Sequence, residues 1–567
     1  MSNAKRQAQE ARRLERRQEE ENRNREAKIK EFFDQGVACQ QRGDFTRAIS
    51  FYQAVTDIDP KRYEAYSNMG NCFYQLQNLQ AASGSCMQAI YLRPDIADHW
   101  HNHAIVLLSA GAYEDCETQA RRALEINPDY IESWNAISVS QYLRGQMKEA
   151  LATAYRMVEI DPNYSTGWTN ISNTHLALQQ WQLAAEAADK AVTLNPRNEK
   201  AWNNYGVSVQ HLGDLNGALA KYEQAMEILP GFVEAELNHS MLLMKLGRLK
   251  EGWVRYECRW RSKSMIEMGN SLPQPQWTGQ DVCGKKLLLI CEQGFGDSLQ
   301  FIRYAALFKK LGATVFVGNV NSPLARLFEQ TPGIDALYIQ GAPLPAFDYA
   351  VPLMSIPRHI WKVIPDIDER PWTGVYLSPK PTDVVKWYNR VEEAARGDLK
   401  VGLVWAGDPR KSVLEASLID TRRSMRFDDL APFINIPGIK YFSLQKGEPA
   451  KQLGDSHLGD NIVDWKADLL DFNDTAALIV HLDVVVTVDT SVCHLAAGMG
   501  KKVLMLSRYD GCWRWGIDET VTPYYPSMTI LRQPTPGDWK TPVEQAKTLL
   551  CSAVQSQKNE REEEAVA

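Results

Sequence analysis

The feature that most restricts the fold of this chain is a repeat of 34 residues in its first half. Six prolines share this step, namely Pro60, Pro94, Pro128, Pro162, Pro196 and Pro230. Four tryptophans (Trp100, Trp134, Trp168, Trp202) and two sets of small residues (Gly36, Gly70, Ala104, Ser138, Ser172, Gly206, Ser240, and Ala48, Ala82, Ala150, Ala184, Ala218) share it too. A period of this length predicts stacked units that bury their apolar faces against one another.

This pattern resembles the tetratricopeptide repeat, in which each unit is a pair of helices. Small residues let the paired helices approach, aromatic side chains fill the gaps between them, and a proline closes the second helix. We therefore expect an α-solenoid over residues 31–265, with six full repeats and a partial seventh.

Asparagine occupies one position of the first helix in five repeats, two residues after the aromatic position. The row consists of Asn68, Asn102, Asn170, Asn204 and Asn238, and Ala136 interrupts it. Amides can bind an extended peptide backbone, although a solvated polar face explains the row equally well. The fragment SNMGNCFYQLQNLQAA (67–82) resembles the repeats of protein O-GlcNAc transferase, and this resemblance implies that the row binds a protein or peptide partner.

Beyond the repeats, strand-like and helix-like segments alternate. KKLLLIC (285–291) and ATVFVG (313–318) belong to a first series, and KVGLVWAG (400–407) begins a second. This alternation predicts α/β domains with parallel sheets. We expect two Rossmann-like halves, at 284–390 and 398–555, with the binding site in the cleft between them.

The ends of the chain and its composition narrow the class of protein. Residues 1–30 are rich in Arg and Glu and are either a solvated helix or disordered, and an acidic tail covers 556–567. A net charge of -7 argues against nucleic acid as the main partner. Without a transmembrane segment or signal peptide, and with ten scattered cysteines, the chain is expected to be cytoplasmic.

Four motifs of the second half resemble the heptosyltransferase-like, family 9-type glycosyltransferases of the two-Rossmann (GT-B) kind. In order they are EQGFGDSLQFIRYAALF (292–308), VGLVWAGDPRKS (401–412), YFSLQKG (441–447) and VTVDTSVCHLAAGMGKKV (486–503). The resemblance implies an inverting glycosyltransferase that uses a sugar-nucleotide donor. The two D-x-D triplets, 57–59 and 366–368, do not follow strands as a metal site would require, so we expect no metal and no other cofactor.

The motif around Asp297 joins an apolar strand to a helix. Gly294 and Gly296 permit a tight turn that places the Asp297 carboxylate at the start of the helix. The resemblance assigns Asp297 as the general base. Aspartate is also a favoured residue for capping a helix, so a structural role is the alternative.

The donor diphosphate requires positive potential, which the second half offers at several loops. Asp489, Thr490, Ser491 and His494 follow an apolar strand at the start of a helix, a natural anion site. Ser491 replaces the glycine of the family pattern, and His494 is either a donor contact or a structural histidine. The remaining candidates are Lys446 and Gly447, which follow the strand 439–445, and Arg423, for which a surface salt bridge is the alternative to donor binding.

The sequence thus predicts a glycosyltransferase whose repeats recruit the acceptor. Polypeptide, oligosaccharide and lipid-linked acceptors all stay open. The alternative is a protein-binding scaffold of repeats with a catalytically weak or inactive transferase-like domain.

Overall fold

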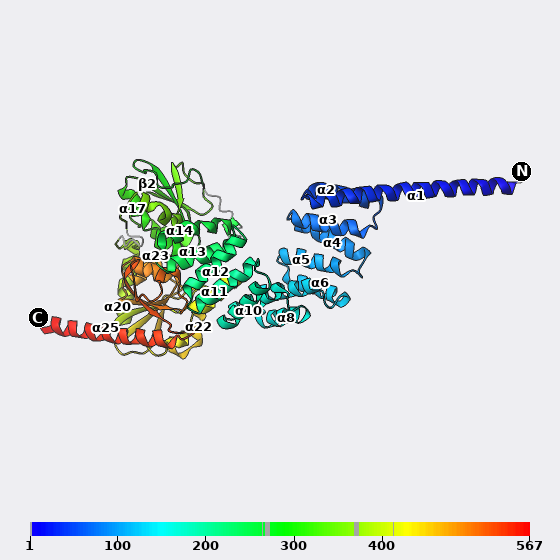
Figure 1. The fold of residues 1–567 in the computed structure, drawn as a ribbon. Coiled ribbons are helices and arrows are strands. Elements are labelled where there is room, and N and C mark those ends of the chain that lie inside the picture. Colours follow the sequence, from blue (N-terminus) through cyan, green and yellow to red (C-terminus); the bar gives the residue numbers. More distant parts are fainter. Residues whose placement is uncertain (1–2, 263–264, 267–272, 368–373, 412, 567) are drawn as a thin grey trace. The chain divides into compact units, whose positions relative to one another are not determined.

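The structure is a computed structural model that describes residues 3–262, 265–266, 273–367, 374–411 and 413–566. It forms two compact units, Met1–Ile228 and Leu229–Ala567 (Figure 1). The boundary between the units falls inside the region 31–265 that the repeat pattern covers. No helix among the described residues is long and apolar enough to cross a membrane.

The first unit consists of helices that follow one another in pairs (Figure 1). They are α1 (Asn3–Gln41), α2 (Phe45–Ile58), α3 (Tyr63–Gln75), α4 (Leu79–Leu92), α5 (Ala97–Ser109), α6 (Tyr113–Ile126), α7 (Ile131–Leu143), α8 (Met147–Ile160), α9 (Ser165–Ala177), α10 (Trp181–Leu194), α11 (Glu199–His211) and α12 (Leu215–Ile228). The predicted α-solenoid is confirmed. Within the charged segment 1–30, residues 6–28 form an exposed part of α1.

The small residue of each repeat faces the side chain sixteen positions later in the chain. A Cβ atom at Gly206 would lie 2.5 Å from the ring of Tyr222, and one at Gly36 would lie 2.7 Å from the ring of Tyr52. Repeats that carry alanine in place of this tyrosine tolerate Ala or Ser at the small position. In the repeats with a tyrosine, the glycine therefore leaves the space that the ring fills between the paired helices.

Each of the four periodic tryptophans is hydrogen-bonded to the proline six residues before it. The indole N–H of Trp100 donates to the carbonyl oxygen of Pro94 at 2.8 Å. The same bond recurs three times, at 2.8 Å from Trp134 to Pro128, 3.0 Å from Trp168 to Pro162 and 2.9 Å from Trp202 to Pro196. Each tryptophan thus ties the first helix of its repeat to the turn before it.

The second unit begins with the helix pair α13 (Val233–Lys245) and α14 (Leu249–Tyr256), followed by the short helix η1 (Glu257–Arg261). Two sheets follow. The first has the order β3-β2-β1-β4 and is parallel. The second has the order β10-β11-β9-β8-β5-β6-β7, in which only the pair β10–β11 is antiparallel. The prediction of two Rossmann-like halves is confirmed.

The remaining elements of the second unit alternate along the chain. The strands are β1 (Lys286–Ile290), β2 (Thr314–Val320), β3 (Ala336–Ile339), β4 (Tyr349–Pro352), β5 (Leu399–Val404), β6 (Ile439–Ser443), β7 (Ile462–Asp464), β8 (Val484–Val488), β9 (Lys502–Ser507), β10 (Val521–Thr522) and β11 (Tyr525–Arg532). The main helices are α16 (Phe295–Phe301), α17 (Tyr304–Lys310), α18 (Ser322–Phe328), α20 (Pro381–Ala395), α21 (Leu414–Arg423), α23 (Phe472–Ile479), α24 (Ser491–Gly498) and α25 (Lys540–Val566).

The pair α13–α14 belongs to the core of the second unit. Trp253 of α14 is buried and meets Phe301 of α16 and Trp513 edge-on, with ring centroids 5.6 and 5.1 Å apart. The same hydrophobic cluster contains residues of the first sheet, such as Leu287, and residues of the second half, such as Leu495. The seventh repeat is therefore a structural part of the α/β unit.

Candidate functional site

The glycine turn, residues 292–297, connects β1 to α16. Asp297 is the third residue of α16, and its Oδ2 atom accepts a hydrogen bond of 3.0 Å from the backbone N–H of Gly294. The N-cap residue is thus Gly294, and Asp297 accepts from its N–H as the third helical residue of a capping box, instead of being the N-cap that the structural alternative names. Gln293 adopts a left-handed conformation with φ +57°, which is unfavourable for a residue with a side chain.

The other oxygen of Asp297 forms an ion pair with Arg514, a residue that the sequence analysis did not identify. The Nη2 atom of Arg514 contacts Oδ1 of Asp297, and its Nε atom donates to Gln300 at 2.5 Å. The guanidinium lies over the ring of Trp513, 4.3 Å from its centroid. Burial opposes the charge of Arg514, but the nearby Cys512 and Asp297 outweigh it and raise its pKa.

A signal for Arg514 was present in the sequence. It lies between two tryptophans in the segment Trp513-Arg514-Trp515, which forms the short helix η7. An arginine held by aromatic rings is a common way to fix a guanidinium for a carboxylate. The partner 217 positions away was not apparent from spacing.

The glycine turn of the first half packs on the start of α24 in the second half. A Cβ atom at Gly296 would lie 3.0 Å from Cδ2 of His494 and 3.8 Å from Cα of Ser491. In the same turn, the ring of Phe295 packs against Phe472 of α23 in a tilted arrangement, with ring centroids 5.2 Å apart. The structure thus brings together Gly296 and Asp297 with two of the predicted donor-binding residues.

His494 is 5% exposed and contacts other buried side chains. Its Nδ1 atom is 2.9 Å from the hydroxyl of Tyr525, and its ring stacks on Trp515. Burial, helped by the charge of Arg514, lowers the pKa of His494 to about 3. The imidazole is therefore neutral near pH 7, which favours a role in positioning the turn over one in proton transfer.

The predicted anion site is the N-terminus of α24, where Asp489, Thr490 and Ser491 are partly exposed. Thr490 is the N-cap residue, and its hydroxyl lies 3.2 Å from that of Thr487 without a capping bond to the backbone. The first N–H groups of a helix lack intrahelical partners and attract anions.

The other predicted donor-binding residues make structural contacts. The ammonium of Lys446 donates to the carbonyl oxygens of Lys466 at 2.8 Å and Leu469 at 2.6 Å, and Gly447 has φ +75°. Arg423 forms an ion pair of 2.9 Å with Asp420. Each cation is thus already engaged by protein atoms.

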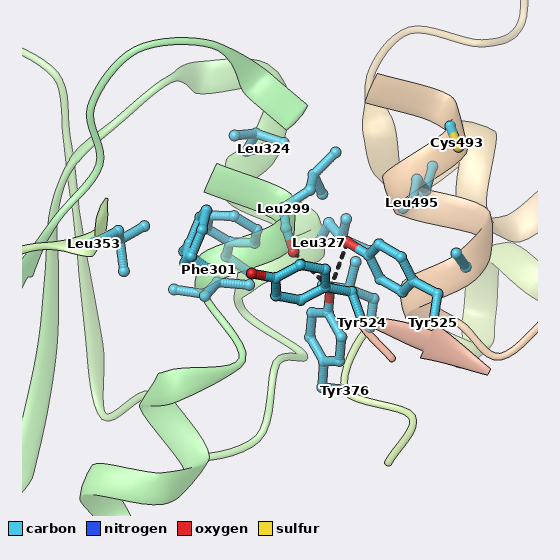
Figure 2. Packing of buried hydrophobic residues seen from close by; sticks show 14 of the residues in the cluster. Leu299, Phe301, Leu324, Leu327, Leu353, Tyr376, Cys493, Leu495, Tyr524 and Tyr525 are labelled. Carbon is cyan, nitrogen blue, oxygen red and sulfur yellow. Dashed lines mark hydrogen bonds between the residues drawn. The ribbon is translucent and has the colours of Figure 1, made fainter. Parts of the chain in front are cut away.

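A tyrosine cluster lies between α16 and α24. Figure 2 shows Tyr376, Tyr524 and Tyr525 between the helix that carries Leu299 and Phe301 and the helix that carries Leu495. The hydroxyl of Tyr376 donates to the carbonyl oxygen of Leu299 at 2.9 Å and lies 3.4 Å from that of Tyr525. These bonds link the two halves beside the glycine turn.

The asparagine row has mixed surroundings. Asn170 donates to the Asn135 amide at 2.8 Å, and Asn204, which is 8% exposed, donates to the carbonyl oxygen of Thr169 at 3.4 Å. Asn68, Asn102 and Asn238 are partly exposed. Asn170 and Asn204 therefore also connect neighbouring repeats, and Asn68 is hydrogen-bonded to Tyr52 of the preceding repeat.

The D-x-D triplet 57–59 lies wholly within the described residues, and the triplet 366–368 lies there only in part. Asp59 forms an ion pair of 2.8 Å with Arg62, and Asp368 lies outside the described residues. In the part of the chain that the structure describes, there is no group of three or more His, Cys, Asp or Glu side chains that could bind a metal ion.

Family models match both parts of the chain. Residues 467–562 match glycosyltransferase family 9 (heptosyltransferase), and residues 33–95 and 169–231 match the tetratricopeptide repeat. The predicted combination of tetratricopeptide repeats with a C-terminal family 9 glycosyltransferase domain is confirmed.

Relatives of the chain cover parts of it. It is 28% identical to Protein FlbA of Caulobacter vibrioides over 324 residues, which are 53% of this chain and 52% of that protein. It is 32% identical over 80 residues to the general transcriptional corepressor ssn6 of Schizosaccharomyces pombe, covering 14% of this chain and 7% of that protein. The chain thus spans about half the length of FlbA and a small part of ssn6.

Among solved structures, the MamA protein is 17% identical, covers 30% of this chain and 94% of its own, and gives a TM-score of 0.28. YrrB, described as a TPR protein with an unusual peptide-binding site, is 17% identical, covers 32% of this chain and 95% of its own, and gives a TM-score of 0.27.

Proposed function

We propose that the second unit transfers a sugar from a nucleotide-diphosphate donor to an acceptor recruited by the repeats, in the cytoplasm. The observation that carries this proposal is the contact of Gly296 with Ser491 and His494. It places a carboxylate from one half beside a helix N-terminus from the other. A transferase needs a base for the acceptor and positive potential for the leaving diphosphate in such proximity.

In this proposal Asp297 takes the proton of the acceptor hydroxyl as the new glycosidic bond forms. Each carboxylate oxygen has two lone pairs, so bonds to Gly294 and Arg514 leave capacity for the acceptor. Arg514 fixes the direction of the carboxylate. A single displacement by the acceptor inverts the configuration of the sugar.

The leaving diphosphate is held at the start of α24 by backbone N–H groups and by Thr490 and Ser491, without a metal ion or another cofactor. Asp489 and His494 support this segment. Lys446 and Gly447 follow the end of β6, whereas Arg423 is the last residue of α21. Lys446 and Arg423 would contact the donor by exchanging their present protein partners for it.

A nucleoside diphosphate should bind in the presence of EDTA, and the change Ser491→Pro should weaken this binding by roughly 10- to 150-fold, the loss of one charged hydrogen bond. Ser491 is the first residue of α24 and follows an extended Thr490 (φ -133°, ψ 173°), so proline fits the backbone while removing the N–H. Calorimetry with ADP, UDP, GDP and CDP measures the effect.

The matched control is Ser491→Ala, which removes the hydroxyl and keeps the N–H. It should bind the diphosphate more tightly than Ser491→Pro. Binding that requires a divalent ion, or equal affinities of the two variants, would contradict the proposed diphosphate site.

The asparagine row is proposed to hold a polypeptide acceptor or partner. Replacing Asn68 and Asn102 together with alanine should weaken the capture of a verified partner peptide, whereas Asn163→Ala, in an exposed turn outside the row, should have less effect. The pair avoids Asn170 and Asn204, which join repeats, and thermal unfolding is measured as well because Asn68 is bonded to Tyr52. Unchanged capture by the double variant, measured by fluorescence anisotropy, would remove the row from the binding surface.

A scaffold with a weak or inactive transferase domain is the second candidate. It is favoured by the engagement of both Asp297 oxygens with protein donors and by Ser491 at the family's glycine position. Hydrolysis of sugar nucleotides, screened over a donor panel, distinguishes the two: a scaffold turns over none of them.

A further inference from the structure

The seventh repeat differs from the first and the sixth at one pair of residues. In the first repeat the hydroxyl of Tyr52 donates to Gln40 of the same helix pair at 2.8 Å, and in the sixth Tyr222 donates to Gln210 at 3.0 Å. Tyr256 occupies the same repeat position, 34 residues after Tyr222, but Met244 stands where the glutamine would be. The tyrosine is kept and its partner within the repeat is lost.

The hydroxyl of Tyr256 instead reaches the glycine turn. It lies 3.1 Å from Nε2 and 3.3 Å from Oε1 of Gln293. Gln293 is the residue with the unfavourable φ of +57°, so a side-chain hydrogen bond at this position offsets part of its cost. Burial raises the pKa of Tyr256 to about 12, which keeps the hydroxyl neutral and able to donate.

A second link joins the same region to the residue before Gln293. The Nε and Nη2 atoms of Arg259 on η1 donate to Glu292, at 2.9 Å each, and the two side chains are 2% and 1% exposed. Arg259 also donates to the hydroxyl of Ser355 at 2.7 Å, and Glu292 accepts from the backbone N–H of Met354 at 3.0 Å. The turn is thus fixed from the repeat side at two consecutive residues.

We propose that Tyr256 and Arg259 are positioning residues through which the last repeat sets the geometry of the glycine turn and hence of Asp297. The links run from α14 and η1 through Glu292 and Gln293 to Gly294, whose N–H is bonded to Asp297. The conformation of the seventh repeat therefore affects the proposed base directly. Only the catalytic consequence rests on the proposed function; the control of the turn does not.

Hydrogen exchange of the full chain tests this control without any ligand. In Tyr256→Phe the amide of Gly294 should exchange roughly 2- to 10-fold faster, the change that loss of one hydrogen bond produces. The matched control is Tyr222→Phe, which loses the equivalent bond inside its own repeat and should leave Gly294 exchange as in the unmodified protein. Equal exchange at Gly294 in both variants would overturn the proposal.

The catalytic consequence is measured with whichever sugar nucleotide the donor panel shows to be turned over. Tyr256→Phe should lower kcat roughly 10- to 100-fold with an unchanged KM for the donor, because a small displacement of a base is costly. Faster exchange with unchanged kcat would overturn the assignment of Tyr256 as a positioning residue. If the unmodified protein turns over no donor, the proposed function fails, and the exchange result still decides whether the repeat holds the turn.

Discussion

Replacing Asp297 with asparagine is expected to lower kcat for sugar transfer by about a hundred to ten thousand fold, while the affinity for the donor stays the same. Asparagine keeps the volume of the side chain, and its amide oxygen can accept the hydrogen bond from the Gly294 N–H. The hydrogen bond from Gly294 is therefore retained, and the loss of kcat measures the contribution of proton transfer. Steady-state kinetics with a verified acceptor, together with thermal unfolding, measure the two properties.

The ion pair with Arg514 requires a control, because Asp297→Asn also removes the charge that balances the guanidinium. Arg514→Gln removes the same ion pair and keeps the carboxylate. If Asp297 is the base, Arg514→Gln should retain more turnover than Asp297→Asn at equal stability. Full activity of Asp297→Asn, or equal losses in the two variants, would contradict the assignment of the base.

Replacing Arg259 with methionine is expected to destabilise the second unit by about 3–5 kcal/mol, because it leaves a buried carboxylate without its partner. Burial already raises the pKa of Glu292, and Arg259 limits this rise. Without Arg259 the folded state would bind the Glu292 proton more tightly than the unfolded state. The loss of stability should therefore grow as the pH rises through the raised pKa.

Calorimetric unfolding of the full chain measures this loss of stability, and two further variants serve as comparisons. Arg259→Met/Glu292→Leu should recover part of the stability, since an apolar pair replaces the ion pair. Arg248→Met removes a pair of 2.7 Å with Glu251 whose side chains are 49% and 56% exposed, and should cost less than about 1 kcal/mol. A loss as small as this in Arg259→Met would show that the buried pair does not stabilise the turn.

The repeat region was predictable because its information is local and recurs. Small residues such as Gly206 were predicted at helix crossings from their shared period, and the structure places the ring of Tyr222 against Gly206. The bond from each tryptophan to a proline carbonyl was not apparent, although both residues have the same period, because a sequence does not show in which direction an indole N–H points. Shared periodicity indicates proximity and leaves the contact unspecified.

The parts of the candidate site that could be predicted are those in which one continuous motif joins the end of a strand to the start of a helix. The glycine turn and the start of α24 each combine a strand end with a helix start, and the structure places them in contact. Arg514 was missed because its partner Asp297 lies in the other Rossmann half. Lys446 and Arg423 were chosen for their charge, but the sequence does not show the carbonyl oxygens and the carboxylate that bind them.

The position of the unit boundary, after Ile228, has a consequence for how such a chain can change over evolution. Repeats before the boundary bury their faces against one another, so whole periods can be gained or lost there without altering the α/β core. Trp253 and Arg259 lie beyond the boundary and are buried in that core. We expect related chains to vary in the number of leading repeats and to inherit the last one together with the domain that follows it.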